Sequence, residues 1–241
     1  MPVGHGDHGG EFFGFCRPCF VFVEGVGWIF GGELDLLDEL GIADNTVVLF
    51  SSDNGGSEHK DVIAAINPGG QLRGHKRTMT EGGIRTPFLV RWPDHTEPGA
   101  ETDHVISHHD VLPTLAQIAG LAKSVPKEVT GLSFVDILDG KSPSKTHAYH
   151  YWEWPRWDWK KQQLTPGGNM QALRQGDWKI LRQRDDQPWE LYHLPDDWGE
   201  KNNLAEKHPD RVKKLAVLAN HARIPMRPQG EPKMPKGKRF R

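Results

Sequence analysis

Residues 45–56, N-T-V-V-L-F-S-S-D-N-G-G, decide the fold. Residues 46–50 form a continuous β-branched and aromatic run, which predicts a short strand buried on both faces of a parallel sheet. Asp53 and Asn54 would then stand at the carboxyl end of that strand, where open α/β sheets bind their ligands. Gly55 and Gly56 let the chain bend sharply after them. The sequence therefore predicts an α/β fold with a ligand site at this strand end.

Two oxygen-bearing side chains placed side by side suit a hard divalent cation. Calcium takes about 6 to 8 oxygen ligands, so Asp53 and Asn54 would supply only part of a Ca²⁺ site. The alternative is that Asp-Asn-Gly-Gly is an ordinary turn after a strand.

Helices are predicted on both sides of this strand in the chain. A leucine recurs every three residues before it, and Gly41 supplies a helix stop. These leucines are Leu34, Leu37 and Leu40. Further along, Asp110 is a good residue to open a second helix. Its packed face would carry Leu112, Leu115 and Ala116. The result is a sheet flanked by helices.

The character of the chain changes after residue 145. Strand patterns occupy residues 149–154, 170–182 and 190–194, and a helix with Pro209 near its start follows. This order predicts a small antiparallel α+β subdomain. Its aromatic cluster could stack on sugar rings or fill the gap between the subdomain and the main sheet. The tryptophans concerned are Trp152, Trp154, Trp157 and Trp159.

Two motifs follow the S-D-N-G-G segment. Residues 72–76 are L-R-G-H-K, and residues 81–93 are E-G-G-I-R-T-P-F-L-V-R-W-P. Together these segments resemble the second half of the catalytic domain of sulfatases of the arylsulfatase type. Further matches follow in the family's order, at residues 107–114, 131–134, 174–180, 190–194 and 202–205. The resemblance implies the alkaline-phosphatase-like sulfatase fold, with an incomplete central sheet flanked by helices and a small C-terminal antiparallel α+β subdomain.

The resemblance also implies a chemistry, the hydrolysis of a sulfate ester. By resemblance, a calcium ion held partly by Asp53 and Asn54 orients the sulfate, and Lys76 is a catalytic residue that binds the sulfate oxygens. A cation beside a developing oxyanion stabilises the transition state. His108 lies near a position where the family keeps a histidine, so it would border the substrate cleft; a capping or packing role is the alternative.

The family's nucleophile is a formylglycine made from Cys or Ser in C/S-x-P-x-R, and that motif is absent here. The segment C-R-P-C-F at residues 16–20 has Phe20 where the family has arginine, and it lies too close to Asp53. We interpret it as a coincidence. The chain alone is therefore expected to bind calcium weakly and to turn over little or no aryl sulfate.

The chain divides into four parts in this interpretation. Residues 1–32 are irregular and need not be native to the domain, 33–145 are the C-terminal part of the catalytic domain, 146–224 are the subdomain, and 225–241 are a basic disordered tail. A net charge of −2 gives no general attraction to nucleic acid. No apolar segment reaches the ~20 residues that span a bilayer. No signal peptide is readable, which leaves the compartment open.

Two other functions fit the same residues. One is a phosphodiesterase or phosphonate hydrolase of the same superfamily. The other is a non-catalytic remnant that binds sulfated glycans through the tryptophan-rich strand. The expected partner is a sulfate ester, and a sulfated glycan if the tryptophans stack on sugars.

Overall fold

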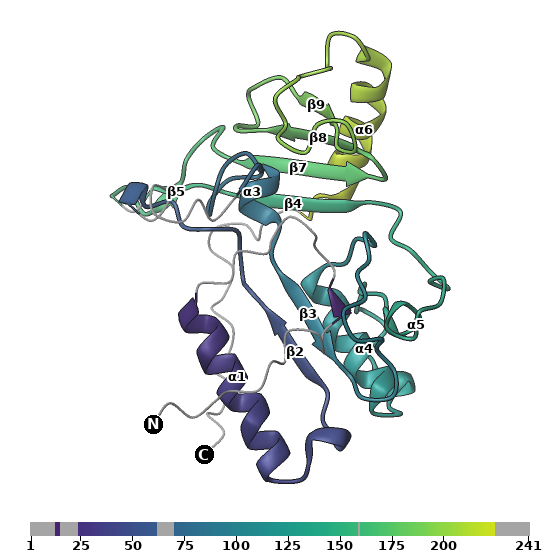
Figure 1. The fold of residues 1–241 in the computed structure, drawn as a ribbon. Helices are drawn as coiled ribbons and strands as arrows, with labels where there is room; N and C mark the ends of the chain where they lie inside the picture. The colour runs from purple at the N-terminus through teal and green to yellow at the C-terminus, as the bar shows by residue number, and fades with distance from the viewer. Residues whose placement is uncertain (1–12, 15–23, 62–69, 159, 225–241) are drawn as a thin grey trace.

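The structure is a computed structural model that describes residues 13–14, 24–61, 70–158 and 160–224. Figure 1 shows a lower part, built around β2 and β3, and an upper part, built around the sheet that contains β4, β7, β8 and β9. The lower part contains the elements up to Leu138, and the upper part contains those from His150 onward. Residues 16–20, Trp159 and the basic tail lie outside the described residues.

The lower part contains three short strands and several helices. They are β1 (Phe13–Gly14), α1 (Glu24–Glu39), η2 (Ala43–Asn45), β2 (Val48–Ser51), α3 (Glu81–Ile84), β3 (Phe88–Arg91), η3 (His108–Asp110), α4 (Val111–Ile118), η4 (Ala122–Ser124) and α5 (Val135–Leu138). The strands form one sheet in the order β1-β3-β2. This sheet lies between α1 and α4 (Figure 1).

Strand β2 differs from its prediction in two ways. β2 pairs antiparallel with β3, with Leu49 opposite Val90, and all four of its residues are only half-buried. Within the described residues no parallel neighbour of β2 is found. The run of β-branched residues fixed the presence of the strand, but the direction of its partner depends on the path of the chain between residues 52 and 87. In this sheet, the strand residue that is fully buried is Val90 of β3.

Helix α1 begins earlier than the leucine pattern predicts. It begins at Glu24, inside the segment that was expected to be irregular, and it ends before Gly41, whose φ of +66° suits glycine. Leu34 is buried, as expected, whereas Leu40 is 60% exposed. The leucine repeat therefore marks the helix but not the full extent of its packed face.

The packed face of α4 also differs from the prediction. Leu112 and Leu115 are 53% and 42% exposed. The buried residue is Thr114, whose hydroxyl donates a hydrogen bond to the carbonyl oxygen of Asp110 (2.7 Å) and accepts one from the amide of Phe134 (3.1 Å). These two bonds fix the rotation of the helix, because they hold Thr114 against the segment that leads into α5.

The upper part matches the expected subdomain. Its elements are β4 (His150–Trp154), β5 (Trp157–Asp158), β6 (Gln163–Leu164), β7 (Met170–Gln175), β8 (Trp178–Arg182), β9 (Glu190–His193) and α6 (Pro209–Ala222). Four strands form an antiparallel sheet in the order β4-β7-β8-β9, and β5 pairs with β6 separately. The strand patterns at residues 149–154, 170–182 and 190–194 predicted β4, β7, β8 and β9. Both faces of their sheet are covered by apolar residues.

The two faces of this sheet have different partners. Leu173 and Ile180 point to the face on which α6 packs through Leu215. Their neighbours Ala172 and Leu181 point to the opposite face, in a cluster that also contains Met79 and Ile84 of the lower part. These two side chains join the lower part to the sheet: Met79 is 5% exposed and Ile84 is half-buried. The upper and lower parts therefore share one apolar cluster.

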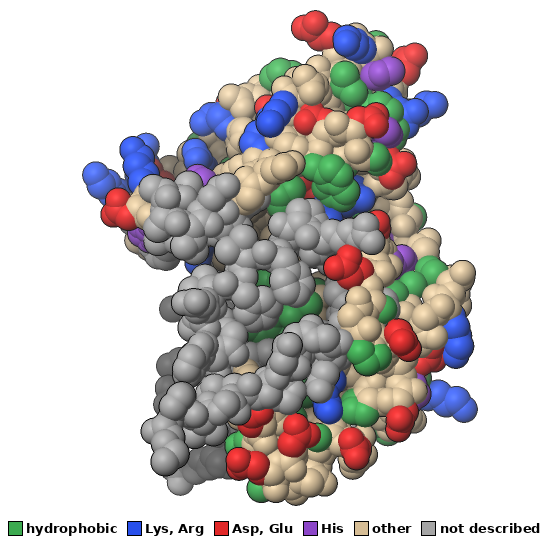
Figure 2. Space-filling model, viewed as in Figure 1, with side chains coloured by type: hydrophobic (Ala, Val, Ile, Leu, Met, Phe, Trp, Pro, Cys, Tyr) green, Lys and Arg blue, Asp and Glu red, His purple; other side chains and the backbone are tan. Residues whose placement is uncertain are grey.

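The surface has no single sign of charge. Figure 2 shows basic side chains gathered near the upper left, in the region of β5, and acidic side chains around the lower end of the molecule. Among the described residues, no helix is long and apolar enough to cross a membrane.

Candidate active site

The predicted metal ligands lie in the turn that follows β2. Asp53 is exposed and Asn54 is half-buried. The hydroxyl of Ser52 donates to the carbonyl oxygen of Asn54 (3.1 Å), and the amide nitrogen of Asn54 donates to the carbonyl oxygen of Gly55 (3.0 Å). Because the side-chain nitrogen of Asn54 is hydrogen-bonded to the backbone, its side-chain oxygen Oδ1 is the atom that a hard cation would bind.

The loop that carries Lys76 is attached to this turn by its backbone. The amide of Lys76 donates to the carbonyl oxygen of Gly56 at 2.7 Å, and the amide of Gly55 donates to the carbonyl oxygen of Gly83 at 2.9 Å. The structure therefore brings the backbones of three predicted motifs together, although they are separated by up to about thirty positions in the sequence. Lys76 itself is half-buried.

Glycines make this close approach possible. A Cβ atom on Gly55 would overlap the carbonyl oxygen of Gly82. A Cβ on Gly82 would lie 2.6 Å from the carbonyl oxygen of Arg73, and one on Gly83 would lie 2.6 Å from that of His75. Real Cβ atoms do not approach oxygens this closely, so only glycine fits at these positions. The glycines of E-G-G lie in α3 and pack against both neighbouring loops.

Arg73 anchors the lysine loop to the subdomain. Its guanidinium donates to the hydroxyl of Tyr192 (2.9 Å), the carbonyl oxygen of Glu200 (2.8 Å) and the carboxylate of Glu190 (3.0 Å). Burial lowers the pKa of Arg73, but the bonds to Glu190 and Tyr192 outweigh it and raise that pKa overall. Arg73 thus holds the loop in place, and its side chain is fully engaged by the subdomain.

A buried ion cluster makes a second attachment. Lys179, on β8, is 0% exposed, and its ammonium lies 2.8 Å from Glu81 Oε1 and 2.9 Å from Glu200 Oε1. The amide of Glu81 donates to Glu200 Oε2 at 2.8 Å. Burial would raise the pKa of Glu81, but the charge of Lys179 lowers it overall, whereas burial keeps the pKa of Glu200 raised despite the same ammonium. The first residue of α3 is therefore tied to the subdomain by both its side chain and its backbone.

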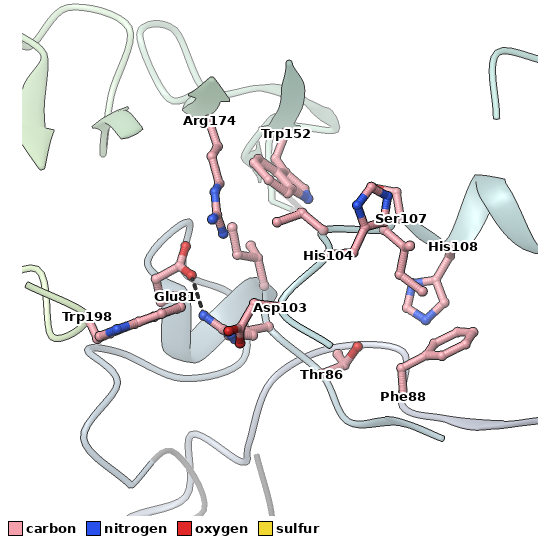
Figure 3. A pocket seen from close by; sticks show the side chains of 14 residues that line it. Glu81, Thr86, Phe88, Asp103, His104, Ser107, His108, Trp152, Arg174 and Trp198 are labelled. Atoms are coloured by element: carbon pink, nitrogen blue, oxygen red, sulfur yellow. Dashed lines mark hydrogen bonds and ion pairs between the residues drawn. The ribbon is translucent and has the colours of Figure 1, made fainter. Parts of the chain in front are cut away.

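A cavity lies between the two parts, next to this cluster. It has a volume of about 130 Å³, and Figure 3 shows Trp152 and Arg174 entering it from the subdomain while His108 and Phe88 line its far side. Arg85 is held at its base, 3.4 Å from Glu81. The cavity therefore combines cationic and aromatic side chains with the two carboxylates of Glu81 and Asp103.

His108 connects the cavity to the end of β2. Its Nε2 atom lies 3.1 Å from the hydroxyl of Ser51, and Ser51 is the last residue of β2, two positions before Asp53. The hydroxyl of Ser51 also donates to the carbonyl oxygen of Pro87. His108 is exposed and lines the cavity; its role at a substrate cleft stays a prediction.

Sequence reasoning missed the arginines of the cavity. Arg85 stacks on the ring of Trp198, 4.1 Å from its centroid, and Arg174 approaches from β7. Both lie inside the quoted motifs, at residues 81–93 and 174–180, so the motifs themselves were a signal. The sequence does not show that Arg85 and Arg174, about ninety positions apart, line the same cavity.

Comparisons with known proteins agree with the quoted motifs. Residues 73–220, more than half of the chain, match the family model described as N-sulphoglucosamine sulphohydrolase, C-terminal, and residues 23–121 match the family model described as Sulfatase. The human protein named steryl-sulfatase is 35% identical over 136 residues, which are 54% of this chain and 23% of that protein.

Solved structures share the fold. A structure from a study of glycosaminoglycan metabolism by Bacteroides thetaiotaomicron aligns with a TM-score of 0.65 and 27% identity, over 82% of this chain and 42% of that one. The phosphonate monoester hydrolase of Agrobacterium radiobacter aligns with a TM-score of 0.64 over 83% of this chain and 39% of that one; at 23% identity this likeness is one of fold alone. The chain spans less than half the length of each of these proteins.

Proposed function

Because the chain belongs to the sulfatase family, we propose that the turn after β2 and the Lys76 loop form part of a site that hydrolyses sulfate esters. The observation that carries this proposal is the backbone hydrogen bond from Lys76 to Gly56. It keeps the lysine loop beside the turn that holds Asp53 and Asn54. In this proposal, the ammonium of Lys76 and the oxygen atoms of Asp53 and Asn54 would face the same sulfate group.

The donor set fits a hard cation in part. The carboxylate of Asp53 and the amide oxygen of Asn54 are the ligand type that Ca²⁺ prefers, but two side chains fall short of the roughly 6 to 8 oxygens that it takes. A bound Ca²⁺ would neutralise part of the negative charge of a sulfate group. We therefore expect these two residues alone to hold it weakly.

Lys76 would bind the sulfate oxygens directly. Its ammonium is a compact charge with three donors, and charge that grows on an oxygen in the transition state is stabilised by a donor already in place. The position of the loop depends on backbone hydrogen bonds and glycine contacts. The side chain of Lys76 is therefore not needed to hold the loop and is available for this role.

The remainder of the substrate would extend toward the cavity. Trp152 offers an apolar face, while Arg85 and Arg174 offer positive charge. This chemistry fits a sulfated glycan, and one of the similar structures comes from work on glycosaminoglycan metabolism. His108 would stand between the sulfate group and the sugar, because it contacts Ser51 and also lines the cavity.

Calcium binding by the purified chain tests the metal assignment. We expect isothermal titration to show weak Ca²⁺ binding that Asp53→Ala weakens by about tenfold or more, equivalent to ~1.4 kcal/mol. Asp44→Ala is the matched control, because Asp44 is also an exposed aspartate and lies before β2. Equal Ca²⁺ affinity in the Asp53 and Asp44 variants would contradict the assignment.

Lys76→Met separates sulfate binding from metal binding. Removal of the ammonium should weaken sulfate binding by the Ca²⁺-loaded chain and should not weaken Ca²⁺ binding, since a cation does not assist another cation. Loss of both affinities together would instead indicate a disrupted loop. Unchanged sulfate binding would refute the role of Lys76.

Turnover assays distinguish the other candidates. The chain alone should release little or no nitrophenol from nitrophenyl sulfate, because the formylglycine motif is not found in it. The fold shared with a phosphonate monoester hydrolase makes matched nitrophenyl phosphonate and phosphate esters the necessary comparison. Faster hydrolysis of those esters would favour that class. Retention on a sulfated-glycan column without any turnover would favour a binding module.

A further inference from the structure

A second cluster of ligating side chains lies away from the Asp53 turn. It comprises His109, Asp110 and His147, and one ligand atom from each lies within 4.8 Å of the other two. The Nε2 atoms of both histidines converge on the same carboxylate oxygen. Asp110 Oδ1 lies 2.7 Å from His147 Nε2 and 3.6 Å from His109 Nε2.

The carboxylate of Asp110 is held rigidly in this arrangement. Its side chain is 2% exposed. Its Oδ2 atom accepts a hydrogen bond from the amide of Ser107 (2.8 Å), and its Oδ1 atom accepts one from the amide of Leu132 (2.7 Å). Backbone donors on two sides therefore fix the orientation of the carboxylate before any ligand arrives, and a preformed ligand of this kind lowers the cost of binding a metal.

We propose that His109, Asp110 and His147 bind a divalent transition-metal ion, with Zn²⁺ as the best match. Two imidazoles and one carboxylate are a ligand set that zinc uses, whereas calcium selects oxygen ligands. Three protein ligands leave one tetrahedral position for water. This site is chemically different from the Asp53 and Asn54 turn, and the inference does not depend on the proposed sulfatase chemistry.

Two of the three ligand distances require only a small adjustment, and the third, between the two histidines, is no more than 4.8 Å. With metal–ligand bonds of about 2.0 to 2.2 Å, ligand atoms at a tetrahedral zinc ion stand ~3.3 Å apart. The contact between His109 and Asp110 is already close to this value, and the one between His147 and Asp110 must lengthen by about half an ångström. Without metal, His147 Nε2 donates its hydrogen to Asp110. On binding, that nitrogen presents its lone pair to the ion, and the proton moves to Nδ1 or to solvent.

The cluster is open to solvent on one side. The side chain of His109 is 49% exposed, and that of His147 is 15% exposed. The edge-to-face approach of the two rings, with centroids 5.1 Å apart, leaves both Nε2 atoms directed toward Asp110. An ion can therefore reach the site without any opening of the core.

The position of the cluster gives the metal a structural role. His109 and Asp110 immediately precede α4 in the lower part, and His147 lies three residues before β4 in the subdomain (Figure 1). A bound ion would link these two segments directly. Metal binding should therefore stabilise the folded chain in proportion to its affinity.

Cobalt absorption tests the ligand set. The full-length, untagged chain is titrated with Co²⁺, which reports tetrahedral coordination by its visible bands, and then with Zn²⁺ as competitor. Because the sequence also contains Cys16 and Cys19, the titration is repeated with both replaced by serine. We expect the bands to persist in that background, Zn²⁺ to abolish them, and Zn²⁺ to raise the melting temperature.

Histidine variants then locate the site. His109→Ala and His147→Ala should each weaken Co²⁺ binding by about tenfold or more, since even the loss of a group that only orients a metal ligand costs about 10- to 100-fold. The matched control is His193→Ala, which removes another histidine paired with an aspartate, Asp196, at 2.6 Å. Circular dichroism checks folding; if His147→Ala unfolds, the exposed His109 decides the outcome alone. The proposal is overturned if the His109 variant binds Co²⁺ as tightly as the His193 variant, or if the cysteine replacements abolish binding.

Discussion

Lys179→Met removes the only ammonium from the buried cluster that ties α3 to the subdomain. Methionine keeps nearly the same length and fills the same space, so the change isolates the charge. It leaves the carboxylates of Glu81 and Glu200 without their cation. The side chain of Glu81 is 4% exposed and that of Glu200 is 0% exposed. We expect a large loss of stability, since neither carboxylate can be rehydrated where it lies.

The magnitude follows from the contacts. Breaking a buried ion pair by removing one partner costs about 3 to 5 kcal/mol. Arg85 compensates for part of this, because it lies 3.4 Å from the second oxygen of Glu81. Glu200 keeps one hydrogen bond, from the amide of Glu81. A decrease of about 3 kcal/mol in the free energy of unfolding is therefore expected, a large share of the ~5 to 15 kcal/mol of a typical domain.

Urea denaturation at neutral pH measures this decrease. Lys213→Met is the matched control, because Lys213 is exposed on α6, and its unfolding free energy should stay within ~0.5 kcal/mol of the starting protein. The double variant Lys179→Met with Glu200→Leu should recover part of the loss, since it removes one stranded carboxylate. A loss below about 1 kcal/mol for Lys179→Met, or no recovery in the double variant, would refute the assignment of a tightly coupled buried cluster.

Two further changes probe the packing of the loops and the response to pH. Gly55→Ala should lower the free energy of unfolding by about 1 to 3 kcal/mol or more, because its Cβ would overlap the carbonyl oxygen of Gly82, and it should also abolish Ca²⁺ binding. The control is Gly32→Ala in α1, where nothing lies within 4 Å of the added atom. Urea denaturation should show this control to be neutral or slightly stabilising. Burial lowers the pKa of His150 from 6.5 to about 4. Between these pH values His150 is protonated in the unfolded chain but neutral in the folded chain. The free energy of unfolding should therefore be highest above pH 6.5 and decrease toward pH 4, by about 2 kcal/mol after allowance for the partial exposure of His150. His150→Asn should make this decrease in stability shallower. An equally steep decrease in the variant would contradict the assignment.

The subdomain was the part of the fold most readily predicted from sequence. The strands β4, β7, β8 and β9 coincide with the strand patterns of residues 149–154, 170–182 and 190–194, and Gly176, with φ of +57°, marks the hairpin between β7 and β8. The start of α1 was not predicted. Residues 24–32 contain four glycines, each of which weakens a helix by about 1 kcal/mol relative to alanine, so local preference argues against the helix that forms there.

The candidate site was predicted in its chemistry but not in its support. Asp53, Asn54 and Lys76 follow from resemblance to a family, and their roles stay predictions even though the backbone joins their loops. The contacts that hold those loops are invisible in the sequence: Arg73 meets Tyr192 across 119 positions, and Lys179 meets Glu81 across 98. No periodic pattern encodes a partner at such a distance, because periodicity reports only which face of an element is buried.

These long-range contacts change how the subdomain is understood. Arg73 and Glu81 belong to the motifs at residues 72–76 and 81–93, the first of which contains Lys76, yet their side chains bind the subdomain and not the proposed sulfate site. The shape of the lysine loop is therefore set partly from the subdomain side, with glycines closing the other side against the turn after β2. A variant that weakens Ca²⁺ or sulfate binding from within the subdomain would act through loop position. For that reason, the chemistry of Lys76 must be judged with the subdomain intact and with variants, such as Lys76→Met, that leave these anchors in place.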